Sequence, residues 1–359
     1  MRRHSAKKVI RVARVSRFIH IFANRLAAHT GNIPYSRQNK NNRIMKKLLL
    51  SAIGIIMSAA ATAQSKVYFT KEITPESLVR IYKALGVKAE GRVAVKISTG
   101  EAGGHNYLKP TLIRGLVEET GGTIVECNTA YPGKRNTTEA HWQTIHEHGF
   151  DSLFAVDIMD EQGNLRIPVK DRRHIKYNIV GSHLGYYDFM INLAHFKGHA
   201  MGGFGGVLKN ASIGVASSDG KAYIHSAGKV QSQKEVWQNL PAQDFFLESM
   251  AAAAQSVHDW FGGRVLYINV MNNLSVDCDC DSHPAKPEMK DVGILASTDP
   301  VALDKACLDI VFSHKAEPGD DNKPLIERIN RQHGTYIVDY AEQIGLGSRK
   351  YTIVDIDRK

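Results

Sequence analysis

Two short segments of this sequence combine residue types that could bind a metal ion or carry out acid–base chemistry. The first contains His195, Lys197 and His199, and the second contains Cys278 and Cys280 in a Cys-x-Cys pair. Imidazoles and thiolates are the ligands that zinc and iron prefer, and histidine is the usual acid–base group near neutral pH. We therefore expect a metal such as Zn or Fe at a joint site with these ligands: His195, His199, Cys278 and Cys280.

A glycine-rich loop after the histidines favours an anionic ligand. It contains Gly202, Gly203, Gly205 and Gly206 and runs into an expected helix that carries Lys209. Glycines allow a close backbone approach, and free amides at a helix start attract anions, so we predict that these four glycines bind an anion. The spacing fits neither the dinucleotide fingerprint nor the P-loop. We predict a catalytic group of four side chains: His195, Lys197, His199 and Lys209.

Simpler interpretations of both segments stay open. The loop could be a tight turn with surface histidines and solvated lysines. Cys278 and Cys280 could be oxidised to a disulfide. In an extended segment they share one face, with the neighbouring aspartates on the other. Cys307 is expected in the core, where a free thiol behaves as a small apolar group.

The elements that must position these residues alternate between strands and helices. Strand, polar loop and helix repeat at least three times in the first half, which predicts an α/β fold with a largely parallel sheet flanked by helices. A small antiparallel excursion is expected over residues 155–180, and a turn over 219–221. In a parallel sheet the loops at Gly100, Asn128 and His195 lie at one edge. The histidines of residues 141, 146 and 148 are expected at the surface or at helix caps.

The net charge of +10 does not indicate nucleic-acid binding. The excess positive charge lies in residues 1–63, which contain no Asp or Glu. Residues 45–63 have a charged start, an apolar centre and Ala61-Thr62-Ala63, which predicts a signal peptide cleaved near Ala63–Gln64 and a periplasmic or secreted protein. The apolar run is short for a membrane span, which needs about 20 residues, although a retained anchor is the alternative. We expect no stable membrane span in the mature chain.

These assignments divide the chain into three parts. We expect residues 1–44 to be an upstream extension that is disordered or not translated, residues 45–63 to be the signal peptide, and residues 64–359 to form a single α/β domain.

Four segments together resemble the domain of unknown function 362 (DUF362) family: residues 96–110, 128–136, 195–210 and 278–309. The resemblance spans about residues 67–356. Many members look like iron–sulfur proteins with a ferredoxin-type insert after the central glycine-rich segment. The matching region here, about residues 227–244, has no cysteine, and the four-cysteine ferredoxin run is absent. The chain therefore resembles the insert-free form.

The resemblance carries over six positions by their motifs, without fixing their roles: His195, Lys197, His199, Lys209, Cys278 and Cys280. We expect an exported, metal-dependent enzyme that acts on a small anionic substrate. One alternative is a non-catalytic envelope protein that binds a metal or a small anion. Another is a redox protein that uses Cys278 and Cys280 as a dithiol. The sequence names no protein partner.

Overall fold

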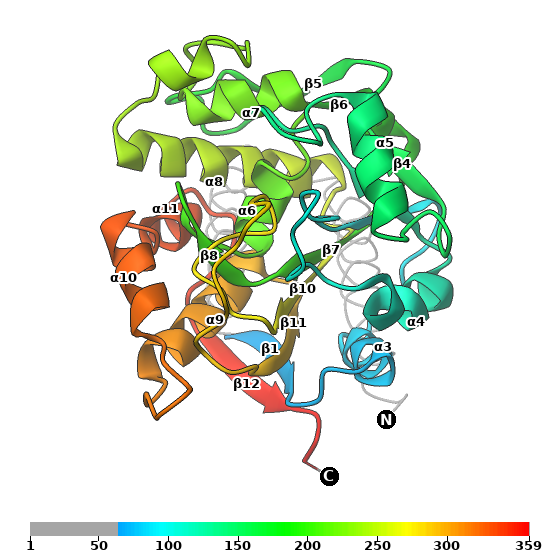
Figure 1. Cartoon of the computed structure of the whole chain (residues 1–359), viewed down its shortest axis with the longest axis vertical. Helices are drawn as coiled ribbons and strands as arrows, with labels where there is room; N and C mark the ends of the chain where they lie inside the picture. The colour runs from blue at the N-terminus through cyan, green and yellow to red at the C-terminus, as the bar shows by residue number, and fades with distance from the viewer. Residues whose placement is uncertain (1–63, 359) are drawn as a thin grey trace, which may run out of the picture. The chain divides into compact units, whose positions relative to one another are not determined.

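Strands and helices alternate along residues 64–358, the part of the chain that this computed structural model describes (Figure 1). The extension predicted for residues 1–44 and the signal peptide predicted for residues 45–63 lie outside this part. An eight-stranded sheet runs through it, with the strands in this order: β12 (Tyr351–Asp355), β1 (Ser65–Thr70), β11 (Gly293–Ser297), β10 (Val265–Met271), β7 (Phe189–His195), β2 (Val93–Lys96), β3 (Thr123–Glu126) and β4 (Val156–Ile158).

The sheet is largely parallel, as the alternation predicted. Strand β11 is antiparallel to both of its neighbours, β1 and β10, and every other pair in the sheet is parallel. Strands β7 and β10 pair with each other, and every residue of both is buried. Continuous apolar runs of this kind are typical of parallel strands covered on both faces.

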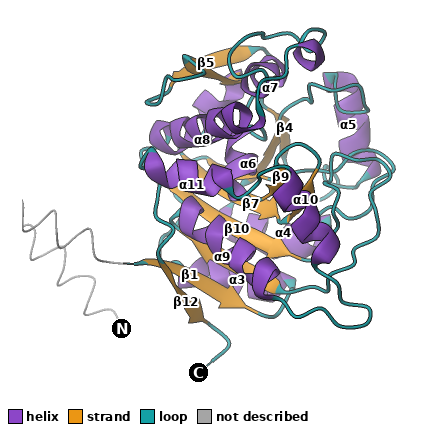
Figure 2. Cartoon of the chain, turned by 90° about the vertical axis from the view of Figure 1, so that its left-hand side faces the viewer, coloured by secondary structure: helices purple, strands orange, loops and turns teal. Residues whose placement is uncertain are grey.

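Helices cover both faces of the sheet. One face packs against α6 (Val207–Ser212), α8 (Gln243–Trp260), α9 (Pro300–Ser313) and α11 (Tyr336–Gln343), and the other against α3 (Pro75–Ala84), α4 (Pro110–Thr120) and α5 (Thr138–Glu147). Figure 2 shows α8 and α11 side by side. Alternate residues of β7 enter different cores: Met190 and Ala194 join the first, and Ile191 and Leu193 the second. This alternation follows from the two-residue period of a strand.

The antiparallel excursion is present but smaller than residues 155–180. It consists of β5 (Asn164–Pro168) and β6 (Tyr177–Gly181), whereas β4 pairs parallel with β3 as the edge of the main sheet. The turn predicted over residues 219–221 is wrong, because these residues lie in α7 (Ser218–His225). A side chain at Gly220 would overlap the carbonyl of Ile179. The glycine therefore permits close packing of α7 on β6 rather than a turn.

The segment after β7 forms a short hairpin instead of an open loop. Strand β8 (Lys197–His199) pairs antiparallel with β9 (Gly203–Gly205), and α10 (Lys323–Arg331) packs against both. Gly203 has a φ of +80°, which favours glycine, and it contacts Gly334. Two short 3₁₀ helices, η1 (Ser182–Tyr186) and η2 (Val236–Gln238), complete the elements. Within residues 64–358, no helix is both long and apolar enough to cross a membrane.

Candidate functional site

The loops that follow β2, β3 and β7 meet at a cavity of about 440 Å³. Parallel strands place their carboxyl ends at one edge of a sheet, where ligands commonly bind. The lining combines residues from the four segments singled out in the sequence with side chains of α7 and η2. Its charged and polar members include Lys96, Glu101, Glu126, Arg135, His199, Lys209, Lys221, His225, Cys278 and Cys280.

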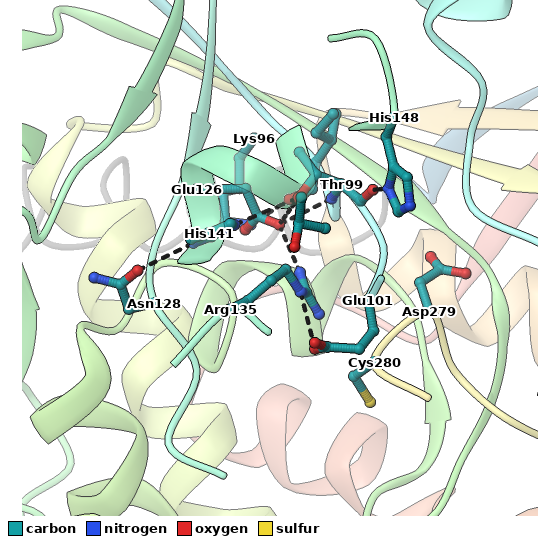
Figure 3. A network of polar contacts seen from close by, with 12 residues as sticks. Lys96, Thr99, Glu101, Glu126, Asn128, Arg135, His141, His148, Asp279 and Cys280 are labelled. Atoms are coloured by element: carbon teal, nitrogen blue, oxygen red, sulfur yellow. Dashed lines mark hydrogen bonds and ion pairs between the residues drawn. The ribbon is translucent and has the colours of Figure 1, made fainter. Parts of the chain in front are cut away.

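A buried network of charges forms one wall of this cavity (Figure 3). Glu126 accepts hydrogen bonds from Lys96 Nζ at 2.7 Å and from Arg135 Nη1 at 3.1 Å, and Arg135 Nε contacts Glu101 at 3.2 Å. All four side chains are at most 5% exposed. Burial alone would raise the pKa of Glu126, but the two cations lower it to about 2. The carboxylate therefore stays ionised and holds both cations in place.

Two histidines contact Thr99, which adjoins this network. His141 is completely buried, with Nδ1 3.1 Å from Asn128 Oδ1 and Nε2 3.5 Å from Thr99 Oγ1. The prediction that His141 lies at the surface or at a helix cap is therefore wrong, because it is a buried residue within α5, and burial lowers its pKa to about 3. His148 is half-buried and contacts the Thr99 carbonyl at 2.8 Å, whereas His146 is exposed as predicted.

Among the cavity lysines, the amines of the exposed Lys134 and of Lys209 have no bonding partner in the described part of the chain, and Lys209 is the one shielded from solvent. Within residues 64–358 its amine forms no hydrogen bond and no ion pair, and the side chain is only half-buried because it faces the cavity. Burial first, and then the nearby charge of Lys197, lower its pKa to about 7. Lys221 has no carboxylate partner either and donates only to the Ala216 carbonyl at 2.6 Å. Two lysines without counter-charges leave the cavity with an excess of positive charge.

His199 faces the same cavity with a defined tautomer. Its Nδ1 accepts from the backbone amide of Gly202 at 2.8 Å, so in the neutral ring the proton lies on Nε2. Burial, followed by the charge of Lys209, lowers the pKa of His199 well below its ordinary value. The Nε2 atom makes no hydrogen bond with the described residues, although His199 lines the cavity. The ring thus offers a hydrogen-bond donor to a ligand.

His195 and Lys197, the other two predicted catalytic residues, are not among the residues that line the cavity. Asp279 forms ion pairs with both, and His195 Nδ1 lies 2.9 Å from its carboxylate. His195 Nε2 contacts the Asn272 carbonyl at 2.6 Å. Both partners of the His195 ring are acceptors, so only the imidazolium makes both bonds and neither nitrogen has a lone pair for a metal. These residues fix the Cys278 segment against β7 and β8.

Three of the four predicted metal ligands come together. The ligand atoms of His199, Cys278 and Cys280 lie within 4.8 Å of one another, so the described residues contain a candidate metal-binding group. Cys278 and Cys280 are joined in a disulfide, the alternative left open by the sequence. A disulfide offers no thiolate, so this group can bind a metal only after reduction. Cys307 is a free thiol in the core, as predicted.

The glycine-rich segment does not offer free amides to an anion. The first amides of α6, those of Val207 and Leu208, donate to the Asp304 carboxylate, each at 2.9 Å. A side chain at Gly206 would overlap the same carboxylate, and Gly203 and Gly205 belong to β9. The glycines therefore serve the packing of the hairpin and of Asp304. The groups available to an anion are instead side chains of the cavity wall.

Asp279, Glu126 and Arg135 are central to the site, yet the sequence alone gave no reason to select them. Glu126 lies 30 residues from Lys96, Arg135 lies 34 residues from Glu101, and Asp279 lies 84 residues from His195. No local spacing relates these pairs. One signal was present: in an extended Cys-x-Cys segment the middle residue points away from the cysteines. The segment is a turn in the structure, in which the amide of Asp281 donates to the Cys278 carbonyl, and Asp279 still points away from the cysteines: Cys278 and Cys280 line the cavity and Asp279 does not.

The chain belongs to the DUF362 family, a domain of unknown function, whose model matches residues 93–309. Among solved structures it is similar to the lactate racemase apoprotein from Thermoanaerobacterium thermosaccharolyticum, with 12% identity over 82% of this chain and 83% of that chain and a TM-score of 0.38. It is also similar to a protein from Thermotoga maritima, with 10% identity over 76% of this chain and 59% of that chain and a TM-score of 0.37. No curated protein sequence matches the chain. Scores this low support no inference about activity.

Proposed function

We propose that this protein is an enzyme that binds a small anionic substrate in the cavity and uses Lys209 as its acid–base group. The observation that carries the proposal is the Lys209 amine, which faces the cavity without a partner. A half-buried lysine without a counter-charge is unfavourable by itself and becomes favourable once an anion lies beside it. Lys221 adds a second positive charge, and His199 Nε2 donates a hydrogen bond to the same ligand.

The chemistry expected of this arrangement is proton transfer. An amine with a pKa of about 7 is about half deprotonated near neutral pH, so it can both accept and donate a proton. The fixed pairs Lys96–Glu126 and Arg135–Glu101 hold the opposite wall rigid and keep it charged. A substrate with an acidic C–H or O–H group beside its anionic group fits these requirements.

Anion binding coupled to proton uptake tests the proposal. At pH 8 Lys209 is largely neutral, and an anion raises its pKa, so calorimetry of phosphate, sulfate and small carboxylates should show proton uptake in buffers of different ionisation enthalpy. Lys209→Met should abolish the uptake and weaken binding. Lys134→Met, which removes an exposed lysine of the cavity lining, is the matched control and should retain the uptake. Unchanged uptake in Lys209→Met would refute the assignment.

Turnover separates an enzyme from a binding protein. The same carboxylates incubated with the protein in D₂O should exchange a C–H proton for deuterium, which proton NMR detects. Binding without exchange or any other change of the ligand would favour the non-catalytic alternative instead.

A metal-dependent reaction is a second candidate, favoured by the proximity of His199 to Cys278 and Cys280. Reduction of the disulfide would provide two thiolates, and with an imidazole they suit Zn or Fe. A neutral His199 ring that binds a metal through Nε2 must carry its proton on Nδ1. Nδ1 could then no longer accept the hydrogen bond from the Gly202 amide. Zinc titration of the reduced protein, with Cys280→Ser as the comparison, tests this candidate: zinc bound equally by both proteins would exclude it.

We also propose that the protein is exported and cleaved near Ala63–Gln64. The support is the pattern of residues 45–63, which has the three parts of a signal peptide. Amino-terminal sequencing of the protein from the cell envelope should begin at or near Gln64. A mature protein that begins at Met1 or Met45 would contradict the proposal.

A further inference from the structure

A second group of potential metal ligands lies at the β4 edge of the sheet. Asp157 belongs to β4, Glu161 follows in the next turn, and His183 belongs to η1. One ring nitrogen of His183 and one carboxylate oxygen each of Asp157 and Glu161 lie within 4.8 Å of one another. None of the three lines the cavity. Carboxylates near an imidazole are common on protein surfaces, so their proximity alone does not indicate a metal site. The hydrogen bonding of the His183 ring supplies the second observation.

The His183 ring has one nitrogen bonded and one without a partner. The residue is 5% exposed. Nδ1 lies 2.8 Å from Asp157 Oδ1, and because a carboxylate only accepts, Nδ1 carries the proton. Nε2 therefore presents a lone pair, yet it is buried and has no hydrogen-bond partner among the described residues. A buried polar atom without a partner is unfavourable, and a bound cation would remove this cost.

Neighbouring groups hold the possible ligands in place. Asp157 Oδ2 accepts from the Tyr187 hydroxyl at 2.6 Å, and Glu161 Oε2 accepts from Trp142 Nε1 at 3.4 Å. The amide of His183 donates to the Met159 carbonyl at 3.0 Å, which fixes η1 against the end of β4. The ring also stacks on Tyr186, with the centroids 4.9 Å apart. Only Glu161 is exposed, so it can adjust to an arriving ion.

We propose that His183 and Glu161 bind a divalent transition-metal ion, with Asp157 orienting the imidazole ring. His183 Nε2 supplies the nitrogen ligand, Glu161 supplies an oxygen ligand, and water completes the coordination. A carboxylate on the far nitrogen of a metal-bound histidine fixes its tautomer and raises its basicity. A mixed nitrogen and oxygen set suits Zn²⁺, Mn²⁺, Co²⁺ or Ni²⁺ and disfavours Mg²⁺ and Ca²⁺. The site is independent of the cavity and of its proposed reaction.

Metal titration of the whole protein tests the proposal. The oxidised protein, stripped with a chelator, should bind one equivalent of Zn²⁺ in calorimetry. Ni²⁺ or Co²⁺ should quench the fluorescence of Trp142, which contacts Glu161. Trp142→Phe should remove most of this quenching, because the chain contains only two other tryptophans and neither forms a hydrogen bond with these ligands.

Three variants and one matched control decide the outcome. His183→Ala should lose the bound equivalent, and Glu161→Gln, a change at an exposed residue that leaves folding intact, should weaken zinc binding at least about tenfold. Asp157→Asn should weaken it about 10–100-fold, the usual effect of losing such an orienting partner. His146→Ala removes an exposed histidine of α5 that pairs with Asp151 in the turn after that helix, and it should change nothing. The proposal is overturned if the unmodified protein binds no zinc at millimolar concentration, or if Glu161→Gln and His183→Ala bind it as the unmodified protein does.

Discussion

Replacement of Lys209 by Met should make the protein more stable, and the gain should depend on pH. The pKa of this amine is about 7 in the folded protein and 10.5 ordinarily. Between these values the unfolded chain binds a proton that the native state does not, so the native state gains stability as the pH rises from 7 to 10.5. The depressed pKa costs about 4 kcal/mol at pH 7 and about 2 kcal/mol at pH 9. Partial exposure to the cavity makes these figures upper bounds.

Urea denaturation at pH 7 and at pH 9 measures this effect. Lys209→Met keeps an unbranched side chain, one atom shorter, and breaks no hydrogen bond, so it should be up to about 4 kcal/mol more stable than the unmodified protein at pH 7. The gain should shrink by about half at pH 9. Lys66→Met, an exposed change on β1, is the matched control and should shift stability by less than about 0.5 kcal/mol. A variant no more stable at pH 7, or a gain that is equal at both pH values, would refute the burial of an unpaired amine.

Three further predictions concern the walls of the cavity. Glu126→Gln leaves two buried cations short of a counter-charge and should lower the free energy of unfolding by about 3–5 kcal/mol, measured by urea denaturation; a loss below about 1 kcal/mol would contradict the network. A thiol reagent should label no cysteine of the native protein until a reductant opens the disulfide, and should then label Cys280 first, because Cys278 and the two free cysteines are buried; labelling without reductant would show that the pair is not oxidised. Gly198→Ala places a methyl group on the Val276 carbonyl and should destabilise the protein by about 1–3 kcal/mol, whereas Gly185→Ala, with open space around it, should be nearly neutral in the same thermal melts.

The sequence predicts the frame of this protein better than its site. Apolar runs such as residues 189–194 and 265–270 identify buried strands, and their alternation with helices implies the parallel sheet and its common edge. That edge brings His199 to Cys278 and Cys280 across about eighty residues of sequence. The prediction succeeds here because it depends only on strand direction.

The orientation of individual side chains at that edge could not be predicted. His195 and His199 are four residues apart, yet a hairpin begins between them and turns His195 toward Asp279 and His199 toward the cavity. Similarly, Asp304 lies on α9, 97 residues from the amide that it contacts, and it fills the position that an anion was expected to take. Such choices depend on long-range pairing of charges, for which one sequence contains no local signal.

The close approach of Gly198 to Val276 joins the β8–β9 hairpin and the segment of Cys278 and Cys280 at their backbones. The amide of Gly198 donates to the Ser275 carbonyl at 2.8 Å, and any side chain at Gly198 would overlap the backbone of Val276. The β8–β9 hairpin and the loop that carries Cys278 and Cys280 therefore form one structural unit, which can be exchanged only as a whole. A chimaera with another DUF362 protein should exchange residues 195–206 and 272–281 together, because either segment transplanted alone would meet a foreign backbone at van der Waals distance.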